Sequence, residues 1–129
     1  MATWRRRALD VFPDLRHDLN SPDYTIYRLF IDALPALREA HRVGDDRQLS
    51  RIYGFAAWCS KQRSTLLWNA AGVSFYEYLF DEPWMWEAVC PWLSADIRVK
   101  HMELWEARLP PKDVDRVKKL LARNPPRHA

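Results

Sequence analysis

The sequence predicts an all-α protein, a single compact domain of about six to seven helices arranged as antiparallel pairs. Only three of the 129 residues are glycine and 17 are aromatic, which disfavours strands with tight turns and any glycine-rich phosphate loop. Apolar residues also recur at steps of three and four along most of the chain, as on one face of a helix. An irregular bundle and a short curved helical stack both fit this pattern.

The N-terminal part is expected to form a helix over residues 3–12, stopped by Pro13, and one further turn to about Leu19. Residues 21–23, Ser-Pro-Asp, predict the start of a long helix, because they combine a capping hydroxyl, a first-turn proline and an acid. This helix should kink at Pro35 and end at Gly44.

Asp45 or Asp46 is expected to cap the next helix, whose buried stripe is Leu49, Ile52, Tyr53, Ala56 and Cys59. Residues 64–80 are apolar on nearly every side and predict the central helix of the domain. Within it, Asn69 and Glu77 are the candidate buried polar residues.

Beyond residue 80, acids at positions 81 and 82 before Pro83 predict a new helix start. Ser94 is expected to cap another helix, and Pro110-Pro111 separates it from a final helix that ends at Asn124. We therefore predict a domain over residues 1–124 and a flexible tail over residues 125–129.

Charge is distributed unevenly along the chain, although the net charge is only +3. Residues 64–97 contain five acids, no Lys or Arg, and nearly half of the aromatic residues. Within this segment Trp84 and Trp86 are two positions apart, so on a helix they point about 200° apart and at least one should be exposed. An exposed tryptophan rimmed by acids is typical of a surface for a basic protein partner, with Trp84, Trp86, Glu82 and Glu87 as candidates. The alternative is that these rings only fill the core.

A carboxylate buried on the central helix needs a partner, and Arg51, Lys61 or Arg98 are candidates to pair with Glu77. The competing interpretations of Glu77 are a structural ion pair, a partner-binding residue and a catalytic acid or base.

No catalytic residue, cofactor or metal site is expected. The four histidines lack zinc-ligand spacing, and no nucleophile motif is present. The two cysteines, Cys59 and Cys90, are expected to be packed in reduced form rather than joined or metal-bound. No apolar stretch is long enough to cross a membrane and none resembles a secretory signal, so a cytoplasmic location without membrane contact is expected.

Three stretches, DVFPDL at residues 10–15, RIYGFAAWC at 51–59 and LWNAAGVSFYEYL at 67–79, resemble a family of small uncharacterised bacterial helical proteins. The similarity spans roughly residues 9–109 and includes Asn69 and Glu77. The family has no assigned activity, so the resemblance implies a helical fold and no functional residues. Small helical proteins of this sort are sometimes immunity partners that neutralise toxins.

We predict a non-enzymatic module that binds a basic protein partner through the acidic, tryptophan-rich segment. The alternative is a weak nucleic-acid-binding protein that uses residues 5–7, all arginine, and the basic C-terminal helix. Nucleic acid is the less favoured partner, since aromatic residues interleave with acids rather than with Lys or Arg. An enzyme built around Glu77 is a third hypothesis.

Overall fold

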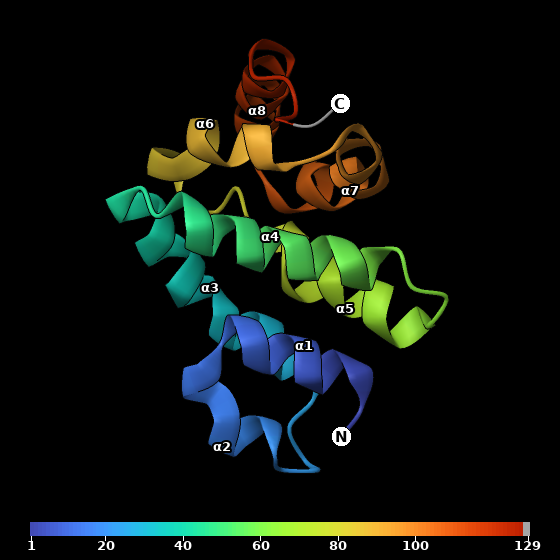
Figure 1. Ribbon diagram of the computed structural model, residues 1–129. Helices are drawn as coiled ribbons and strands as arrows, with labels where there is room; N and C mark the ends of the chain where they lie inside the picture. Colours follow the sequence, from blue (N-terminus) through green and yellow to red (C-terminus); the bar gives the residue numbers. More distant parts are fainter. Residues whose placement is uncertain (128–129) are drawn as a thin grey trace. The chain divides into compact units, whose positions relative to one another are not determined.

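The computed structural model describes residues 1–127, and within them the chain is helical throughout, with eight α-helices, four short 3-10 helices and no strand (Figure 1). The predicted all-α class is therefore confirmed, and the predicted number of helices is close. The chain forms two compact units, Met1–Phe75 and Tyr76–Ala129.

The N-terminal unit contains six helices. They are α1 (Thr3–Val11), η1 (Pro13–Leu15), α2 (Arg16–Leu19), α3 (Ile26–Val43), α4 (Asp46–Ser60) and α5 (Thr65–Ser74). The last three pack against one another, and α1 packs on α4. Phe30 lies at the centre of their core, with ring centroids 5.6 Å from Phe55 and 5.5 Å from Phe75.

The predicted start of the long helix at residues 21–23 is wrong. The helix begins at Ile26, and Thr25 is its N-cap, accepting a hydrogen bond from the backbone N–H of Arg28 at 3.1 Å. Residues 21–24 instead turn around the guanidinium of Arg5. It donates to the carbonyl oxygens of Leu19, Ser21 and Tyr24 at 2.9, 2.9 and 2.6 Å.

The boundary between α3 and α4 follows the prediction. Gly44 has a left-handed conformation, with φ of 71°, and ends α3. Asp45 caps α4 by accepting from the backbone N–H of Gln48 at 3.1 Å. Pro35 lies inside α3, which continues to Val43, so the kink stays a prediction.

The predicted central helix over residues 64–80 is also corrected, because α5 ends at Ser74. Phe75, with φ of −127° and ψ of −71°, leaves the helical conformation. Its buried ring packs edge-on to Tyr53 with centroids 5.9 Å apart. The carbonyl oxygen of Tyr76 accepts from the indole N–H of Trp105 at 2.7 Å. These contacts outweigh the apolar pattern that favours a longer helix.

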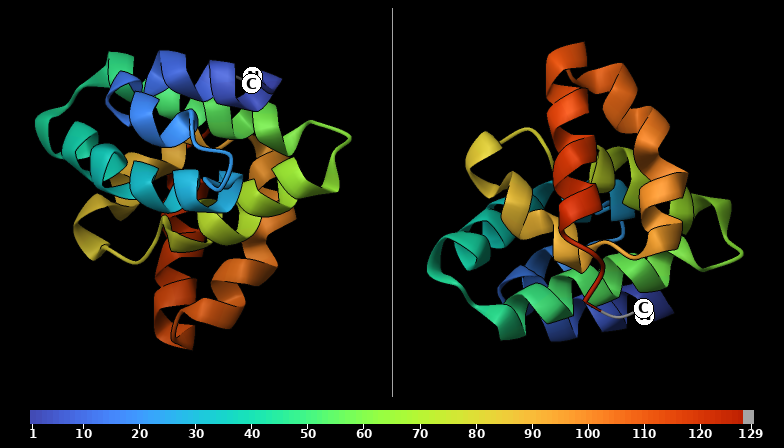
Figure 2. Two further views of the ribbon diagram at one scale, coloured as in Figure 1. Left: turned by 90° about the horizontal axis from the view of Figure 1, so that it is seen from below. Right: turned by 90° about the horizontal axis from the view of Figure 1, so that it is seen from above.

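The C-terminal unit is built from short turns followed by two longer helices. They are η2 (Tyr76–Tyr78), η3 (Pro83–Met85), α6 (Trp86–Val89), η4 (Cys90–Trp92), α7 (Ala95–Arg108) and α8 (Pro111–Arg123). As predicted, Ser94 caps α7, accepting from the backbone N–H of Ile97 at 3.3 Å. Helix α8 contacts both α6 and α7, and Figure 2 shows it between them in the view on the right.

Arg98 fastens the C-terminal end of α8 to the turns before α7. Its guanidinium donates to four carbonyl oxygens, those of Leu93 at 2.9 Å, Leu121 at 2.7 Å, Cys90 at 2.6 Å and Asn124 at 2.6 Å. Since the last carbonyls of a helix have no intrahelical donors, this side chain supplies them. Arg98 is therefore not the partner of Glu77.

The predicted extents of the domain and the tail stay predictions. In the tail, the backbone N–H of Arg127 donates to the carbonyl oxygen of Pro91 at 2.8 Å, and residues 128–129 lie outside the described part of the chain. No helix among the described residues is long and apolar enough to span a membrane.

Candidate functional site

Trp84 and Trp86 diverge, as their spacing predicts. The side chain of Trp84, on η3, is 55% exposed, whereas Trp86, on α6, is only 3% exposed. Trp86 is therefore a core residue, and its place in the predicted partner-binding set is corrected. Trp84 is fixed in position because the two residues that follow it, Met85 and Trp86, are both buried.

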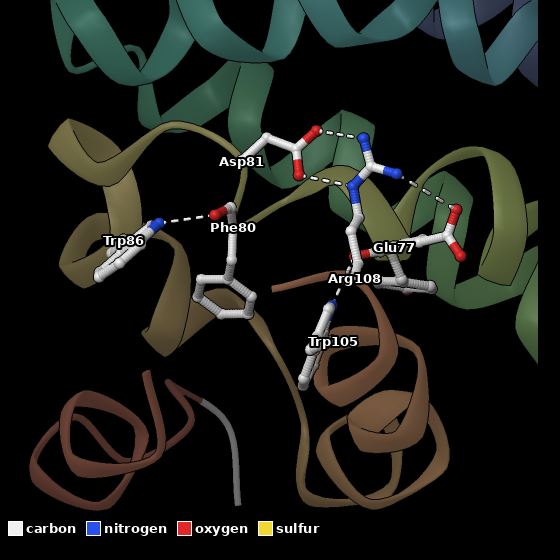
Figure 3. A network of polar contacts seen from close by, with 7 residues as sticks. Glu77, Phe80, Asp81, Trp86, Trp105 and Arg108 are labelled. Atoms are coloured by element: carbon white, nitrogen blue, oxygen red, sulfur yellow. Dashed lines mark hydrogen bonds and ion pairs between the residues drawn. The ribbon is translucent and has the colours of Figure 1, made fainter. Parts of the chain in front are cut away.

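A hydrogen bond donated by Trp86 restrains the segment that carries Trp84. The indole N–H of Trp86 donates to the carbonyl oxygen of Phe80 at 2.7 Å, closing the loop in which Trp84 lies (Figure 3). The bond is buried, so it is protected from competition with water.

Arg108, at the end of α7, restrains the same segment through contacts with its acidic side chains. Its Nε and Nη2 donate to the two carboxylate oxygens of Asp81 at 2.7 and 2.8 Å, and Nη1 lies 3.9 Å from Oε2 of Glu77 (Figure 3). The guanidinium also lies 4.2 Å from the ring centroid of Tyr78. Asp81 and Tyr78 are thus both held by one side chain, and the hydrogen bond that Arg108 donates to Asp81 raises the pKa of Arg108.

This arrangement corrects the prediction for Glu77. Glu77 does not lie on a long helix and pairs with none of Arg51, Lys61 and Arg98; its partner is Arg108, and its side chain is only half-buried. As predicted, a helix begins directly after the acids at positions 81 and 82, since η3 starts at Pro83; the two oxygens of Asp81 are bound by Arg108. The sequence separation of 27 residues between Asp81 and Arg108 gives no local signal of the pair.

Trp105, a buried residue of α7, is the third side chain that restrains this segment. It is fully buried, its indole donates to Tyr76, and its ring meets Phe80 edge-on with centroids 4.9 Å apart. Residues 76–86 are therefore held by Trp105 at their start, Arg108 in the middle and Trp86 at the end (Figure 3).

We call Glu82, Trp84 and Glu87 the Trp84 surface. Glu87 is exposed and Glu82 is partly exposed, and neither forms an ion pair with another described residue. The acidic character of the segment is smaller than its sequence indicates, since Arg108 compensates Asp81 and Arg116 lies 5.3 Å from the ring centroid of Trp86. These arginines come from α7 and α8, and the sequence alone does not show that they lie near this segment.

Asn69, the other candidate buried polar residue, lies on α5 in a partly buried position. Its Nδ2 donates to the hydroxyl oxygen of Tyr27 on α3 at 2.9 Å. This bond links α5 to α3 within the N-terminal unit.

Two histidines are partly or fully buried. Nε2 of His41 lies 2.7 Å from the hydroxyl of Tyr53, and burial lowers the pKa of His41 to about 4. His101 stacks on Tyr76 with ring centroids 4.5 Å apart, its Nε2 has no hydrogen-bond partner, and burial lowers its pKa to about 4 as well. Both imidazoles are therefore neutral near pH 7.

Both cysteines are free and buried, as predicted. Burial raises the pKa of Cys59 to about 12 and that of Cys90 to about 11, so neither is an activated thiolate. Among the described residues, no group of three or more His, Cys, Asp and Glu side chains is placed to hold a metal ion.

The N-terminal arginines of the nucleic-acid alternative make intramolecular contacts. Arg5 holds the three carbonyls described above, and the guanidinium of Arg7 lies 4.5 Å from the ring centroid of Trp58. Arg6 donates to the carbonyl oxygen of Met1 at 2.9 Å.

The comparisons with known proteins concern the family alone. No curated protein and no solved structure matches the chain. A family model described as a domain of unknown function, DUF7674, matches residues 5–107, which include the anchored segment and end just before Arg108. The predicted resemblance to an uncharacterised family is thereby confirmed, and the chain belongs to the family of proteins with the DUF7674 domain.

Proposed function

We propose that this chain is a non-enzymatic protein-interaction module that binds a basic protein partner through the Trp84 surface. One observation carries the proposal: a tryptophan that is 55% exposed lies on a segment held by three separate side chains. Rigid, exposed aromatic residues are the usual anchors of protein interfaces, because they bury a large area at a small cost in conformational entropy.

The charge of the expected partner follows from the rim of the surface. Glu82 and Glu87 flank Trp84 and are not compensated by a described cation, so they favour a partner with Lys or Arg around the pocket that receives the indole. An immunity-like role would make this partner a toxin, which is a specific case of the same proposal.

The other functional hypotheses have less support. A nucleic-acid-binding role would rest mainly on the basic C-terminal helix, because Arg5 and Arg7 make contacts within the N-terminal unit. A catalytic role for Glu77 needs a carboxylate with access to substrate, and its contact with Arg108 favours a structural role.

Affinity capture from an extract of the source organism tests the proposal, with Trp84→Ala compared against wild type. Loss of one or more captured basic proteins in the variant is expected, and Glu87→Lys should lose the same proteins by charge repulsion. Trp68→Ala is the matched control, because Trp68 is also exposed but lies on α5. Identical captured proteins with wild type and Trp84→Ala would reject the proposal.

A further inference from the structure

A shallow apolar groove of about 460 Å³ is lined by residues of α7 and α8, none of which belongs to the Trp84 surface. Val99, Met102, Leu121 and Ala122 form its apolar lining, and Arg98 and Lys118 are its charged residues. Val99 is 81% exposed, the most exposed of the large apolar side chains in the described chain. Methionine side chains adapt to the shape of what they contact, so Met102 suits a binding groove.

The groove carries positive charge that carboxylates only partly compensate. Arg98 donates to four neutral carbonyl oxygens and forms no ion pair with a described carboxylate. Lys118 lies 3.8 Å from Glu106 in a largely exposed pair, which solvent screens strongly. The chain from residue 98 to its end has nine basic and four acidic residues, so the groove lies in its most basic part.

The Trp84 surface has the opposite properties, with an exposed indole instead of an apolar groove and two carboxylates instead of two cations. We propose that the groove between α7 and α8 of one copy of this chain receives the Trp84 surface of a second copy. In this arrangement the indole of Trp84 contacts Met102 and Val99, while Glu82 and Glu87 face Arg98 and Lys118. The inference rests on the proposed function and names a second copy as the basic partner.

The two surfaces differ, so the contact is heterologous: after the first contact, one copy still has an open groove and the other still has an open Trp84 surface. Such contacts continue into rings or open chains of copies instead of stopping at a dimer. One tryptophan buries only about 150–250 Å², so the interface is small and the association is concentration-dependent.

Sedimentation velocity of the purified chain over a wide concentration range tests this inference. We expect the weight-average mass to rise with concentration and the rise to shrink at high salt, because ion pairs at the rim are screened. Trp84→Ala and Val99→Asp should each weaken association by at least about tenfold. Both side chains are exposed, so neither change removes a core contact.

The matched controls make the same kinds of substitution at exposed positions on a different helix. Trp68→Ala removes an exposed indole on α5, and Leu66→Asp introduces an acid at an exposed apolar position on the same helix. Both controls should associate as wild type does.

Mixing the two variants provides the sharpest result. The Trp84→Ala chain keeps an intact groove and the Val99→Asp chain keeps an intact Trp84 surface, so an equimolar mixture should form heterodimers that stop at two copies. A wild-type chain that stays monomeric at all concentrations, or a mixture with no heterodimer when wild type associates, would overturn the inference. Either result leaves the proposed function standing if Trp84→Ala still loses a captured basic protein, so the two failures are distinguishable.

Discussion

Arg108 and Asp81 form a two-point ion pair, with Nε and Nη2 of the arginine 2.7 and 2.8 Å from the two carboxylate oxygens. The pair joins the last residue of α7 to the turn that precedes η3. Its geometry uses the planar fork of the guanidinium, which an ammonium group does not reproduce. Through this pair, a helix end determines where the loop bearing Trp84 lies.

Arg108→Ala is expected to lower the free energy of unfolding by about 1 kcal/mol, since the pair is bidentate but both side chains remain partly solvated. Arg108→Lys should recover only part of this loss. Urea unfolding of Arg108→Ala, Asp81→Asn and the double variant measures the coupling between the two residues. Fully additive effects would show that the pair contributes nothing to stability.

Trp105→Phe should destabilise the protein by about 2 kcal/mol, because it removes the buried indole bond to Tyr76 and leaves unfilled space in the core. Tyr76 O keeps its second donor, the backbone N–H of Leu79 at 3.2 Å, which limits the loss. Trp68→Phe, at a position that is 39% exposed, should destabilise the protein less than Trp105→Phe does. Urea unfolding compares the two variants, and equal effects would contradict the role assigned to Trp105.

Stability should fall as the pH is lowered from 6.5 towards 4. Burial lowers the pKa of His41 and His101 from 6.5 to about 4, so in this range the unfolded chain binds more protons than the folded one. This contribution to stability is complete above pH 6.5 and is lost through the window, with a slope of up to about 1.4 kcal/mol per pH unit for each imidazole.

His101→Phe tests which residue causes this slope, because phenylalanine retains a ring to stack on Tyr76 but has no titrating nitrogen. The variant should keep only the His41 contribution between pH 6.5 and 4, as measured by urea unfolding at several pH values. An unchanged slope would assign the acid sensitivity to other groups.

Neither cysteine should react with a thiol reagent in the folded protein, because both are buried and burial raises the pKa of Cys59 and Cys90. Ellman's reagent should detect no fast-reacting thiol in buffer and two thiols per chain in denaturant. Rapid reaction of the folded chain would contradict the described packing.

The elements that the sequence predicts correctly depend on contacts close in the chain. Gly44 ends α3 and Asp45 caps α4 through bonds that span at most four residues, and Ser94 caps α7 in the same way. The predictions that are wrong concern elements whose conformation depends on residues far away in the sequence. The turn at residues 21–24 is held by Arg5, 16 to 19 positions away, and α5 ends just before Tyr76, which is bound by Trp105, 29 positions away.

The candidate site shows the same difference between what local sequence predicts and what depends on distant residues. The divergence of Trp84 and Trp86 follows from their spacing, so one exposed tryptophan was predictable. Which of the two is exposed depends on the bond from Trp86 to Phe80, and the partner of Glu77 depends on where α7 ends. The sequence shows a segment without Lys or Arg, but only the fold shows that Arg108 and Arg116 approach it.

Site-specific photo-crosslinking at position 84 tests whether Trp84 contacts a protein partner, with a photoreactive phenylalanine derivative replacing Trp84 and, as control, Trp68. Position 84 should give a covalent adduct with a basic protein or a second copy of the chain, and position 68 should not. An absence of adducts from position 84, or the same adducts from both positions, would contradict this prediction.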